Sequence, residues 1–328
     1  QTCALPISLT IGQQQLVEIA RALSVGARII IMDEPTSSLS QQETETLFEV
    51  VRELRRSGVS IIYISHRLAE VQELADRVAV FRDGRNAGQL NRQQVTHDAL
   101  VQLMVGRDLS RFYSRKPHSL GDVILEISDL ATESWPQHRI SFRVRSGEIV
   151  GMAGLVGAGR SEVLRVLFGI DPLIAGTISI DGQMRNVASP RAAIDAGLAL
   201  VPENRKTEGL IVESSVAGNI GLAGLRRFCR AGCFVNSRKT SADTSQMIDR
   251  LRIKTPHADQ VVQLLSGGNQ QKVVLGKWLT MNPRILLLDE PTRGIDIGAK
   301  QEIYGLMEEL ANQGVAILFA SSEMEEIL

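Results

Sequence analysis

The sequence predicts an α/β protein that contains two copies of one domain, each built around a parallel sheet. The main observation is an internal repeat with a fixed offset of 256 residues, since 289−33 and 322−66 give the same number. Its three matched pairs of segments are Leu9–Leu23 with Leu265–Leu279, Ile29–Thr36 with Ile285–Thr292, and Val59–His66 with Val315–Ser322. Repeats of solenoid proteins are about 20–50 residues long, so this long period indicates duplication of a whole domain.

Bulk composition is that of an ordinary globular protein of about two domains. The 328 residues are 44% hydrophobic and 22% charged, and the net charge of −1 gives no reason to expect nucleic-acid binding. No apolar run approaches the roughly 18–20 residues of a membrane-spanning helix, and no secretory leader is recognisable. The three cysteines do not form a disulfide pattern, and Cys229 and Cys233 lack a second pair of metal ligands nearby. A reducing cytoplasm is the expected environment.

The repeat also predicts the domain boundaries. Residues 1–8 show no period and no counterpart at 257–264, so we set them aside as a non-native leader. Residues 9–90 are then the C-terminal part of the first copy, 91–121 a linker, and 122–328 a second copy truncated at its C-terminus. The counterpart of Gly154 would lie at 154−256 = −102, so we expect the chain to be a fragment.

In the second copy, strands are expected at Ile124–Leu130, Ile140–Val144 and Glu148–Ala153, followed by a glycine-rich turn and a helix. The turn GLVGAGRS, residues 154–161, fits the phosphate-loop pattern G-x-x-x-x-G-K-[ST] except at one position.

Each residue type in this turn suits phosphate binding. Gly154, Gly157 and Gly159 allow backbone N–H groups to approach phosphate oxygens, and the Ser161 hydroxyl suits Mg²⁺. Arg160 stands in the lysine position, where it keeps the charge but is larger and forked. A glycine-rich turn without a ligand is the alternative.

The apolar stretch Ile285–Glu290 predicts a central strand that ends in two carboxylates. Asp289 is placed to support Mg²⁺ through water, and Glu290 to polarise a water that attacks a γ-phosphate. The alternative is a strand end with two solvated acids. Recurrence of the same four residues at Asp33–Thr36 argues against that alternative.

Ser266, Gly267 and Gly268 open a predicted helix, and exposed N–H groups at a helix start suit an anion. A simple N-cap is the alternative. Gly268 lies 21 residues before Asp289 (289−268), and Gly12 lies 21 before Asp33 (33−12).

Together, these motifs resemble the nucleotide-binding subunits of ATP-binding cassette transporters. The two-cassette layout, GLVGAGRSE (154–162) and VPENRKTEGL (201–210) are similar to the ATPase subunits of bacterial monosaccharide importers of the ribose, galactose and xylose type. The resemblance covers residues 9–328. It implies a tandem phosphate-loop NTPase fold, in which each cassette has a parallel core sheet, an antiparallel β subdomain and a helical subdomain, here residues 209–264.

The resemblance also implies the function. ATP and Mg²⁺ would be bound between the phosphate loop of one cassette and the signature segment of another, in the same chain or in a dimer. Hydrolysis would energise the import of a simple sugar at the cytoplasmic face of the inner membrane. The implied partners are membrane permease subunits and, indirectly, a periplasmic sugar-binding protein, with no nucleic acid.

Two composite sites follow residue by residue from the resemblance. The first combines an absent phosphate loop with Asp33 for magnesium, Glu34 and His66 for catalysis, and the signature residues Ser266, Gly267, Gly268 and Gln270. The second combines Gly154, Gly157, Ala158, Gly159, Arg160, Ser161, Glu162, Glu203, Asp289 and Glu290 with Thr10 and Gly12 of the first copy.

The second site departs from the family pattern at several positions. Arg160 replaces lysine, Glu203 replaces glutamine, Ser322 replaces histidine, and Ile11 enters the signature segment. These departures predict slow hydrolysis with retained binding. Trp135 could stack on adenine or be a core aromatic at a strand edge.

Two other functions are open. A soluble twin-cassette ATPase acting on ribosomes or DNA is disfavoured by the near-zero net charge. A non-catalytic regulatory module that only binds nucleotide is disfavoured by Glu34 and His66. The sequence does not name the sugar.

Overall fold

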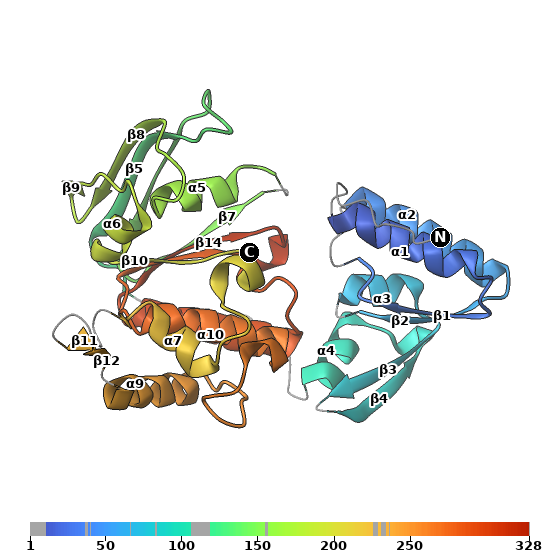
Figure 1. Ribbon diagram of the computed structural model, residues 1–328. Coiled ribbons are helices and arrows are strands. Elements are labelled where there is room, and N and C mark those ends of the chain that lie inside the picture. The colour runs from blue at the N-terminus through green and yellow to red at the C-terminus, as the bar shows by residue number, and fades with distance from the viewer. Residues whose placement is uncertain are drawn as a thin grey trace, which may run out of the picture. The chain divides into compact units, whose positions relative to one another are not determined.

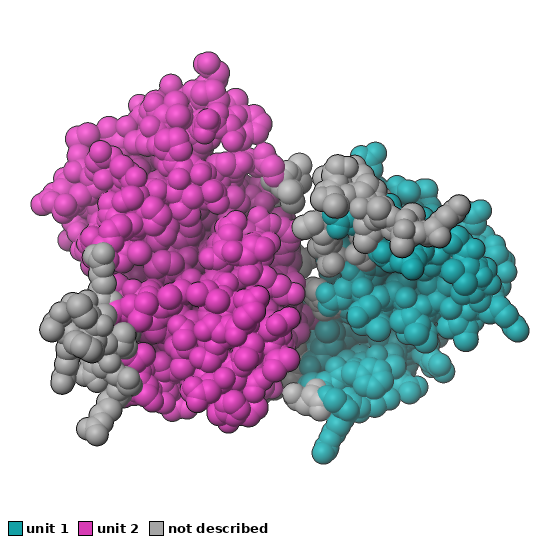
Figure 2. Space-filling view, in the orientation of Figure 1, with its two compact units in different colours: residues 1–113 teal, residues 114–328 magenta. Residues whose placement is uncertain are grey.

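The computed structural model is shown in Figure 1. It describes residues 11–36, 39, 41–65, 67–82, 84–105, 119–154, 157–225, 229–230, 234–235 and 237–327. The chain divides into two compact units, residues 1–113 and residues 114–328 (Figure 2). The division falls inside the segment 91–121 that the sequence predicts as a linker.

Unit 1 combines a parallel pair of strands with an antiparallel pair and covering helices. Its elements in chain order are α1 (Ile11–Ser24), β1 (Ile29–Asp33), α2 (Gln41–Arg56), β2 (Ser60–Ile64), α3 (Leu68–Leu74), β3 (Arg77–Arg82), β4 (Arg85–Asn91), η1 (Arg92–Gln94) and α4 (His97–Val105). Strands β1 and β2 are parallel, with Asp33 opposite Ile64, and β3 and β4 form an antiparallel hairpin.

The expected linker begins later than residue 91. Helix α4 packs on β3 and β4, and its residues Leu100 and Val101 are only 1% and 2% exposed. Helix α4 therefore belongs to unit 1, because Leu100 and Val101 lie in its core.

Unit 2 holds a larger set of elements. They are β5 (Val123–Ala131), β6 (Ile140–Arg145), β7 (Ile149–Ala153), α5 (Arg160–Leu167), β8 (Ala175–Ile180), β9 (Gln183–Met184), α6 (Pro190–Asp195), β10 (Leu198–Val201), η3 (Arg205–Gly209), α7 (Val216–Leu222), β11 (Cys229–Arg230), β12 (Phe234–Val235), α9 (Ser237–Arg250), η4 (Val262–Leu264), α10 (Gly267–Leu279), β13 (Ile285–Asp289), α11 (Ile297–Asn312), β14 (Ala316–Ser321) and α12 (Met324–Ile327).

The centre of unit 2 is a parallel sheet in the order β10-β13-β14-β7. All five residues of β13 are buried, as expected for a parallel strand with both faces covered. Ligands of open parallel sheets bind beyond the carboxyl ends of the strands. This edge carries Asp289 at the end of β13 and the glycine-rich turn after β7.

Alternate residues of the central strands face two separate cores. Leu198, Ile285 and Leu287 pack against α5 and the antiparallel sheet, whose order is β6-β5-β8-β9. Val201, Leu286 and Leu288 pack on the other side against α7, α9, α10 and α11. The expected combination of a parallel core, an antiparallel β part and a helical part is confirmed, and Figure 1 shows the three parts of unit 2.

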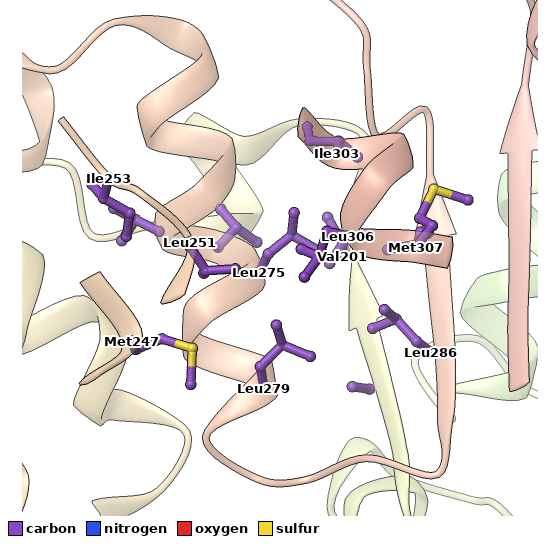
Figure 3. Packing of buried hydrophobic residues seen from close by; sticks show 14 of the residues in the cluster. Val201, Met247, Leu251, Ile253, Leu275, Leu279, Leu286, Ile303, Leu306 and Met307 are labelled. Atoms are coloured by element: carbon purple, nitrogen blue, oxygen red, sulfur yellow. The ribbon is translucent and has the colours of Figure 1, made fainter. Parts of the chain in front are cut away.

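The helical part is joined to the sheet through one apolar cluster (Figure 3). Met247 and Leu251 contact Leu275 and Leu279 of α10, which lie between them and the sheet. A Cβ built on Gly276 would lie 3.0 Å from Met247 Cγ, so the two helices approach closely there. The second half of α10 is therefore held between α9 and the sheet.

One face of the parallel strands differs between the two units. Ile29 and Ile31 of β1 are 62% and 66% exposed, whereas their counterparts Ile285 and Leu287 are completely buried. In unit 2 this face is covered by α5 and the antiparallel sheet. Among the described helices, none is both long enough and apolar enough to cross a membrane.

Candidate functional site

The glycine-rich turn lies between β7 and α5, as the sequence predicts. Gly157 and Gly159 have φ angles of 84° and 88°, a left-handed conformation that favours glycine. A Cβ at Gly157 would meet no atom within 4 Å, so the backbone there is open to a ligand. Gly154 precedes this stretch, Ala158 is exposed, and Leu155 and Val156 lie outside the described residues.

Arg160 occupies the first position of α5, with Gly159 as the N-cap. Its Nη2 donates to Glu290 Oε1 at 3.0 Å. Its Nη1 is buried and has no hydrogen-bond partner in the part of the chain that the structure describes. A buried cationic donor at a helix start fits a phosphate oxygen, because charge-assisted bonds to phosphate are strong and the helix dipole favours an anion.

Ser161, the next residue, contacts Asp289. The Ser161 Oγ donates a hydrogen bond to Asp289 Oδ1 at 3.1 Å. Burial, with smaller contributions from the charges of Glu203 and Glu290, raises the pKa of Asp289 to about 6, against the hydrogen bond from Ser161. Hydroxyl and carboxylate oxygens are the ligands that Mg²⁺ prefers, and it usually keeps water and phosphate oxygens as its remaining ligands. The pair therefore fits a magnesium ion held together with a nucleotide.

Glu290 is engaged through both of its carboxylate oxygens. Ser322 Oγ donates to Oε2 at 3.1 Å, and Arg160 contacts Oε1. The side chain is 7% exposed, and the backbone has a φ of 46°. Both oxygens with which this carboxylate could orient a water molecule are therefore already in contact with protein donors. The two substitutions at Arg160 and Ser322 thus act on the same side chain.

In unit 1, Asp33 and Glu34 follow β1 in the same way. Glu34 has a φ of 45°, and its N–H donates to Ile64 O at 2.9 Å, as the Glu290 N–H does to Ala320 O at 3.0 Å. Gly12 lies in α1, whereas His66 and Thr10 lie outside the described residues. Glu34 and Glu290 therefore share one backbone geometry.

The signature segment begins α10, with Ser266 as N-cap. Ser266 is exposed, and its Oγ accepts from Asn269 Nδ2 at 2.9 Å. A Cβ at Gly268 would lie 2.5 Å from Ala299 Cβ, and one at Gly267 would lie 2.7 Å from Arg205 Nη2. Both glycines are therefore required by packing as well as by any ligand at the helix start.

The Gln270 side chain does not lie at the exposed start of α10, where a nucleotide contact is expected. Its side chain is buried, and Nε2 donates to the carbonyl oxygens of Val262 and Leu265, both at 3.2 Å. The expectation that Gln270 contacts the nucleotide is therefore wrong. Gln270 lies one helical turn after the exposed start of α10, where its side chain is buried in the protein.

Glu203 follows β10 and forms an ion pair with Arg293. Two residues later, the Arg205 guanidinium donates to the carbonyl oxygens of Arg293 and Gly294 at 3.0 and 3.2 Å. Sequence reasoning missed Arg205 and Arg293, since they are 88 residues apart and no spacing rule connects them. Glu162 lies in the first turn of α5.

Trp135 lies between β5 and β6 and is 42% exposed, so it is not a buried core aromatic. A Cβ at Gly159 would lie 2.9 Å from Trp135 Cδ1, which places the indole against the glycine-rich turn. Its ring meets that of His138 edge-on at 5.5 Å.

Comparison with known proteins gives consistent matches. The chain is 50% identical over 321 residues to arabinose import ATP-binding proteins of Shigella boydii and Escherichia coli O157:H7, covering 98% of this chain and 64% of each relative. It is similar in fold to a nucleotide-free ATP-binding cassette from an ABC transporter, with a TM-score of 0.54 at 18% identity over 62% of this chain and 83% of that one. A second cassette, from Clostridium perfringens, gives a TM-score of 0.51 at 22% identity over 62% and 79%.

The family model described as ABC transporter matches residues 2–37 and 137–293. The first range includes residues 2–8, which argues against setting that segment aside as foreign. The second includes the glycine-rich turn, the signature segment and the two carboxylates after β13. With more than half of its residues matched and its phosphate-loop geometry in place, the chain belongs to the ABC transporter family of ATP-binding proteins.

Proposed function

We propose that this chain is part of the ATPase subunit that energises the import of a simple sugar, arabinose or a related monosaccharide. The main observation in favour of a nucleotide site is the Nη1 atom of Arg160 beside the Ser161–Asp289 pair. This atom is buried and has no hydrogen-bond partner among the described residues. The sugar class rests on the relatives, whose printed name is arabinose import ATP-binding protein and of which the chain spans 64%.

In this proposal the turn of unit 2 holds the phosphates of ATP through backbone N–H groups and Arg160. Ser161 and Asp289 hold Mg²⁺, which supplies positive charge to the phosphate oxygens when bound. Trp135 offers an exposed ring face for adenine next to Gly159. The start of α10, from Ser266 to Gly268, presents its N–H groups to a nucleotide held by another cassette.

We assign faster hydrolysis to the site that contains Glu34. In unit 2, Arg160 and Ser322 contact both oxygens of Glu290, so this carboxylate is less available to orient an attacking water molecule. Glu34 follows the same backbone path but belongs to the copy that has His66 where unit 2 has Ser322. One site would then turn over ATP, while the other mainly binds it.

We also propose that the helical part of unit 2 contacts membrane permease subunits on the cytoplasmic side of the membrane. Ile211 and Leu264 are 50% and 73% exposed. They lie on neighbouring segments, since Gln263 N–H donates to Val212 O at 3.0 Å. Two exposed apolar side chains on adjacent segments favour a protein contact. A periplasmic sugar-binding protein would take part only through the permease.

Calorimetric titration of the chain with ATP tests the nucleotide site. With Mg²⁺ present, we expect a dissociation constant below about 1 mM, the upper end of usual substrate affinities, and weaker binding when the metal is chelated. Absence of binding at millimolar ATP would contradict the site. Copurification of a full-length two-cassette subunit with its permease tests the transport role, and copurification with ribosomes would favour the soluble alternative.

A further inference from the structure

A buried carboxylate lies behind the Glu34 segment in unit 1. Glu70 of α3 is 5% exposed, and it accepts hydrogen bonds through both oxygens. Thr36 Oγ1 donates to Oε1 at 2.5 Å, and Ser65 Oγ donates to Oε2 at 2.9 Å. Burial of a carboxylate is costly unless it is fully hydrogen-bonded, so this arrangement needs its donors.

Unit 2 repeats the arrangement 256 residues later. Glu326 of α12 has a side chain that is 3% exposed. Thr292 Oγ1 donates to its Oε1 and Ser321 Oγ to its Oε2, both at 2.6 Å. The threonine and the serine therefore use the same oxygens in both copies. We call each set of Glu, Thr and Ser a carboxylate clamp.

A tyrosine hydroxyl completes each clamp, but it comes from a different element in each copy. In unit 1, Tyr63 on β2 donates to Glu70 Oε2 at 3.0 Å. Its counterpart on β14 is Phe319, and in unit 2 the hydroxyl of Tyr304 on α11 bonds to Glu326 instead. The counterpart of Tyr304 in unit 1 is Phe48. The tyrosine and the phenylalanine have thus exchanged places.

The positively charged side chain next to the carboxylate also comes from a different position in each copy. Arg67 Nη1 lies 3.4 Å from Glu70 Oε1, whereas Lys300 Nζ lies 3.0 Å from Glu326 Oε1. The counterpart of Arg67 is Glu323, and the counterpart of Lys300 is Thr44. Each copy thus supplies a tyrosine hydroxyl and a cation to its carboxylate from different positions, which indicates that the property kept is the set of donors around the carboxylate.

Each clamp joins the two chain segments that border the reactive glutamate. Thr36 lies two residues after Glu34, and Ser65 directly follows Ile64, the acceptor of the Glu34 N–H. The φ of 45° at Glu34 is a left-handed conformation, which a residue other than glycine keeps only when its surroundings enforce it. Glu290 shows the same conformation, with a φ of 46°.

We propose that Glu70 is a positioning residue, which holds the strained backbone of Glu34 so that its carboxylate stays aimed at the attacking water, and that Glu326 does the same for Glu290. The inference rests on the proposed ATPase function. It adds a residue outside the nucleotide motifs that governs the rate of the chemical step without touching the nucleotide.

The test uses a full-length two-cassette subunit that carries this chain, assayed with its permease well below the melting temperature of each variant. Glu70→Leu removes the carboxylate and keeps an apolar side chain of similar length. We expect kcat to fall on the order of tenfold to a hundredfold, as small misplacements of reacting groups do, while the KM for ATP changes by less than about twofold. Glu73→Leu on the same helix is the matched control, because Glu73 is half exposed and paired only with Arg52 among the contacts described. It should leave kcat unchanged.

The tyrosine exchange supplies a rescue. Tyr63→Phe should lower kcat by about fivefold, the effect of one hydrogen bond. Adding Phe48→Tyr gives unit 1 the arrangement of unit 2, and it should restore kcat to near the starting value. If Glu70→Leu does not fold, this pair decides alone. Unchanged kcat in Tyr63→Phe, or no recovery in the double variant, would then overturn the proposal.

The variant Glu34→Gln distinguishes the proposed catalytic role of Glu34 from the proposed positioning role of Glu70. If this variant keeps normal turnover, the assignment of Glu34 as catalytic base fails, whatever Glu70 does. If it is inactive while folded Glu70→Leu turns over ATP normally, or changes only KM, the positioning role fails and the proposed function stands.

Discussion

At the scale of single residues, the chemistry of unit 2 is decided by what surrounds Glu290. Arg160 and Ser322 lie 130 and 32 residues away in sequence, and both donate to its carboxylate. The motif predicts which residue carries the carboxylate, but not that both of its oxygens are occupied. Only the fold brings the three side chains together.

Arg160→Ala should weaken the binding of ATP with Mg²⁺ by about 1.5–3 kcal/mol, because a set of charged hydrogen bonds is lost. Arg160→Lys should bind, since the positive charge remains. Calorimetric titration measures both variants. Arg143→Ala, at an exposed arginine paired with Glu126 on the antiparallel sheet, is the control. Equal affinities of wild type and Arg160→Ala would show that the glycine-rich turn is only a structural relic.

Asp289→Asn should stabilise the nucleotide-free chain above pH 6. Burial raises the pKa of Asp289 from 3.8 to about 6, so the folded chain holds this proton more tightly than the unfolded chain. Stability contributed by the protonated group therefore falls as pH rises from about 4 to 6, by on the order of 1–3 kcal/mol. Thermal melting should show a higher transition temperature for Asp289→Asn at pH 7.5 and a similar one at pH 4. A wild type as stable as the variant at pH 7.5 would contradict the buried-charge explanation.

At the scale of elements, periodicity and strand length predict most of what is observed. The strands around the glycine-rich turn appear within a residue or two of their expected ends, because their apolar alternation is strong. The sequence predicts a start of the linker that is too early. Leu100 and Val101 are buried because α4 packs on β3, and the local sequence pattern does not show this contact. The local pattern likewise does not show that the Gln270 side chain is buried.

The contact of α10 with α11 leads to a pair of opposite predictions. Gly268→Ala should destabilise the chain by about 1–3 kcal/mol, because its Cβ would lie 2.5 Å from Ala299 Cβ. Gly305→Ala in the same α11 should stabilise it by about 0.5–1 kcal/mol, because its Cβ would meet no atom within 4 Å and alanine favours helix. Urea denaturation of both variants measures the free energy of unfolding. A neutral Gly268→Ala would indicate that α11 moves away without cost.

At the scale of the whole molecule, the two copies share motifs but differ in what surrounds them. Asp289 is 5% exposed, whereas Asp33 is exposed at the end of β1. Among the described residues, unit 2 is the copy that combines a glycine-rich turn with its carboxylates, and its Glu290 is engaged by Arg160 and Ser322.

The chain as it stands should therefore hydrolyse ATP slowly, well below the roughly 1 s⁻¹ of an ordinary subunit. Steady-state phosphate release measures this rate, and a value of 1 s⁻¹ or more would refute the expectation.

In a full-length two-cassette subunit, Glu34→Gln should abolish turnover and leave ATP binding intact. Glu290→Gln should have a much smaller effect, because both oxygens of the Glu290 carboxylate are already engaged by Arg160 and Ser322. Phosphate release and nucleotide titration on both variants give the comparison. Equal losses of turnover would contradict the assigned asymmetry between the copies.

The exchange of tyrosine and phenylalanine between the two carboxylate clamps also constrains how the copies diverged. The two copies differ at both positions, so at least two substitutions separate them. A route through phenylalanine at both positions leaves the buried carboxylate without its hydroxyl, whereas a route through two tyrosines keeps a donor at every step. Divergence through a state with tyrosine at both positions therefore keeps the buried carboxylate hydrogen-bonded throughout, whichever copy changed first.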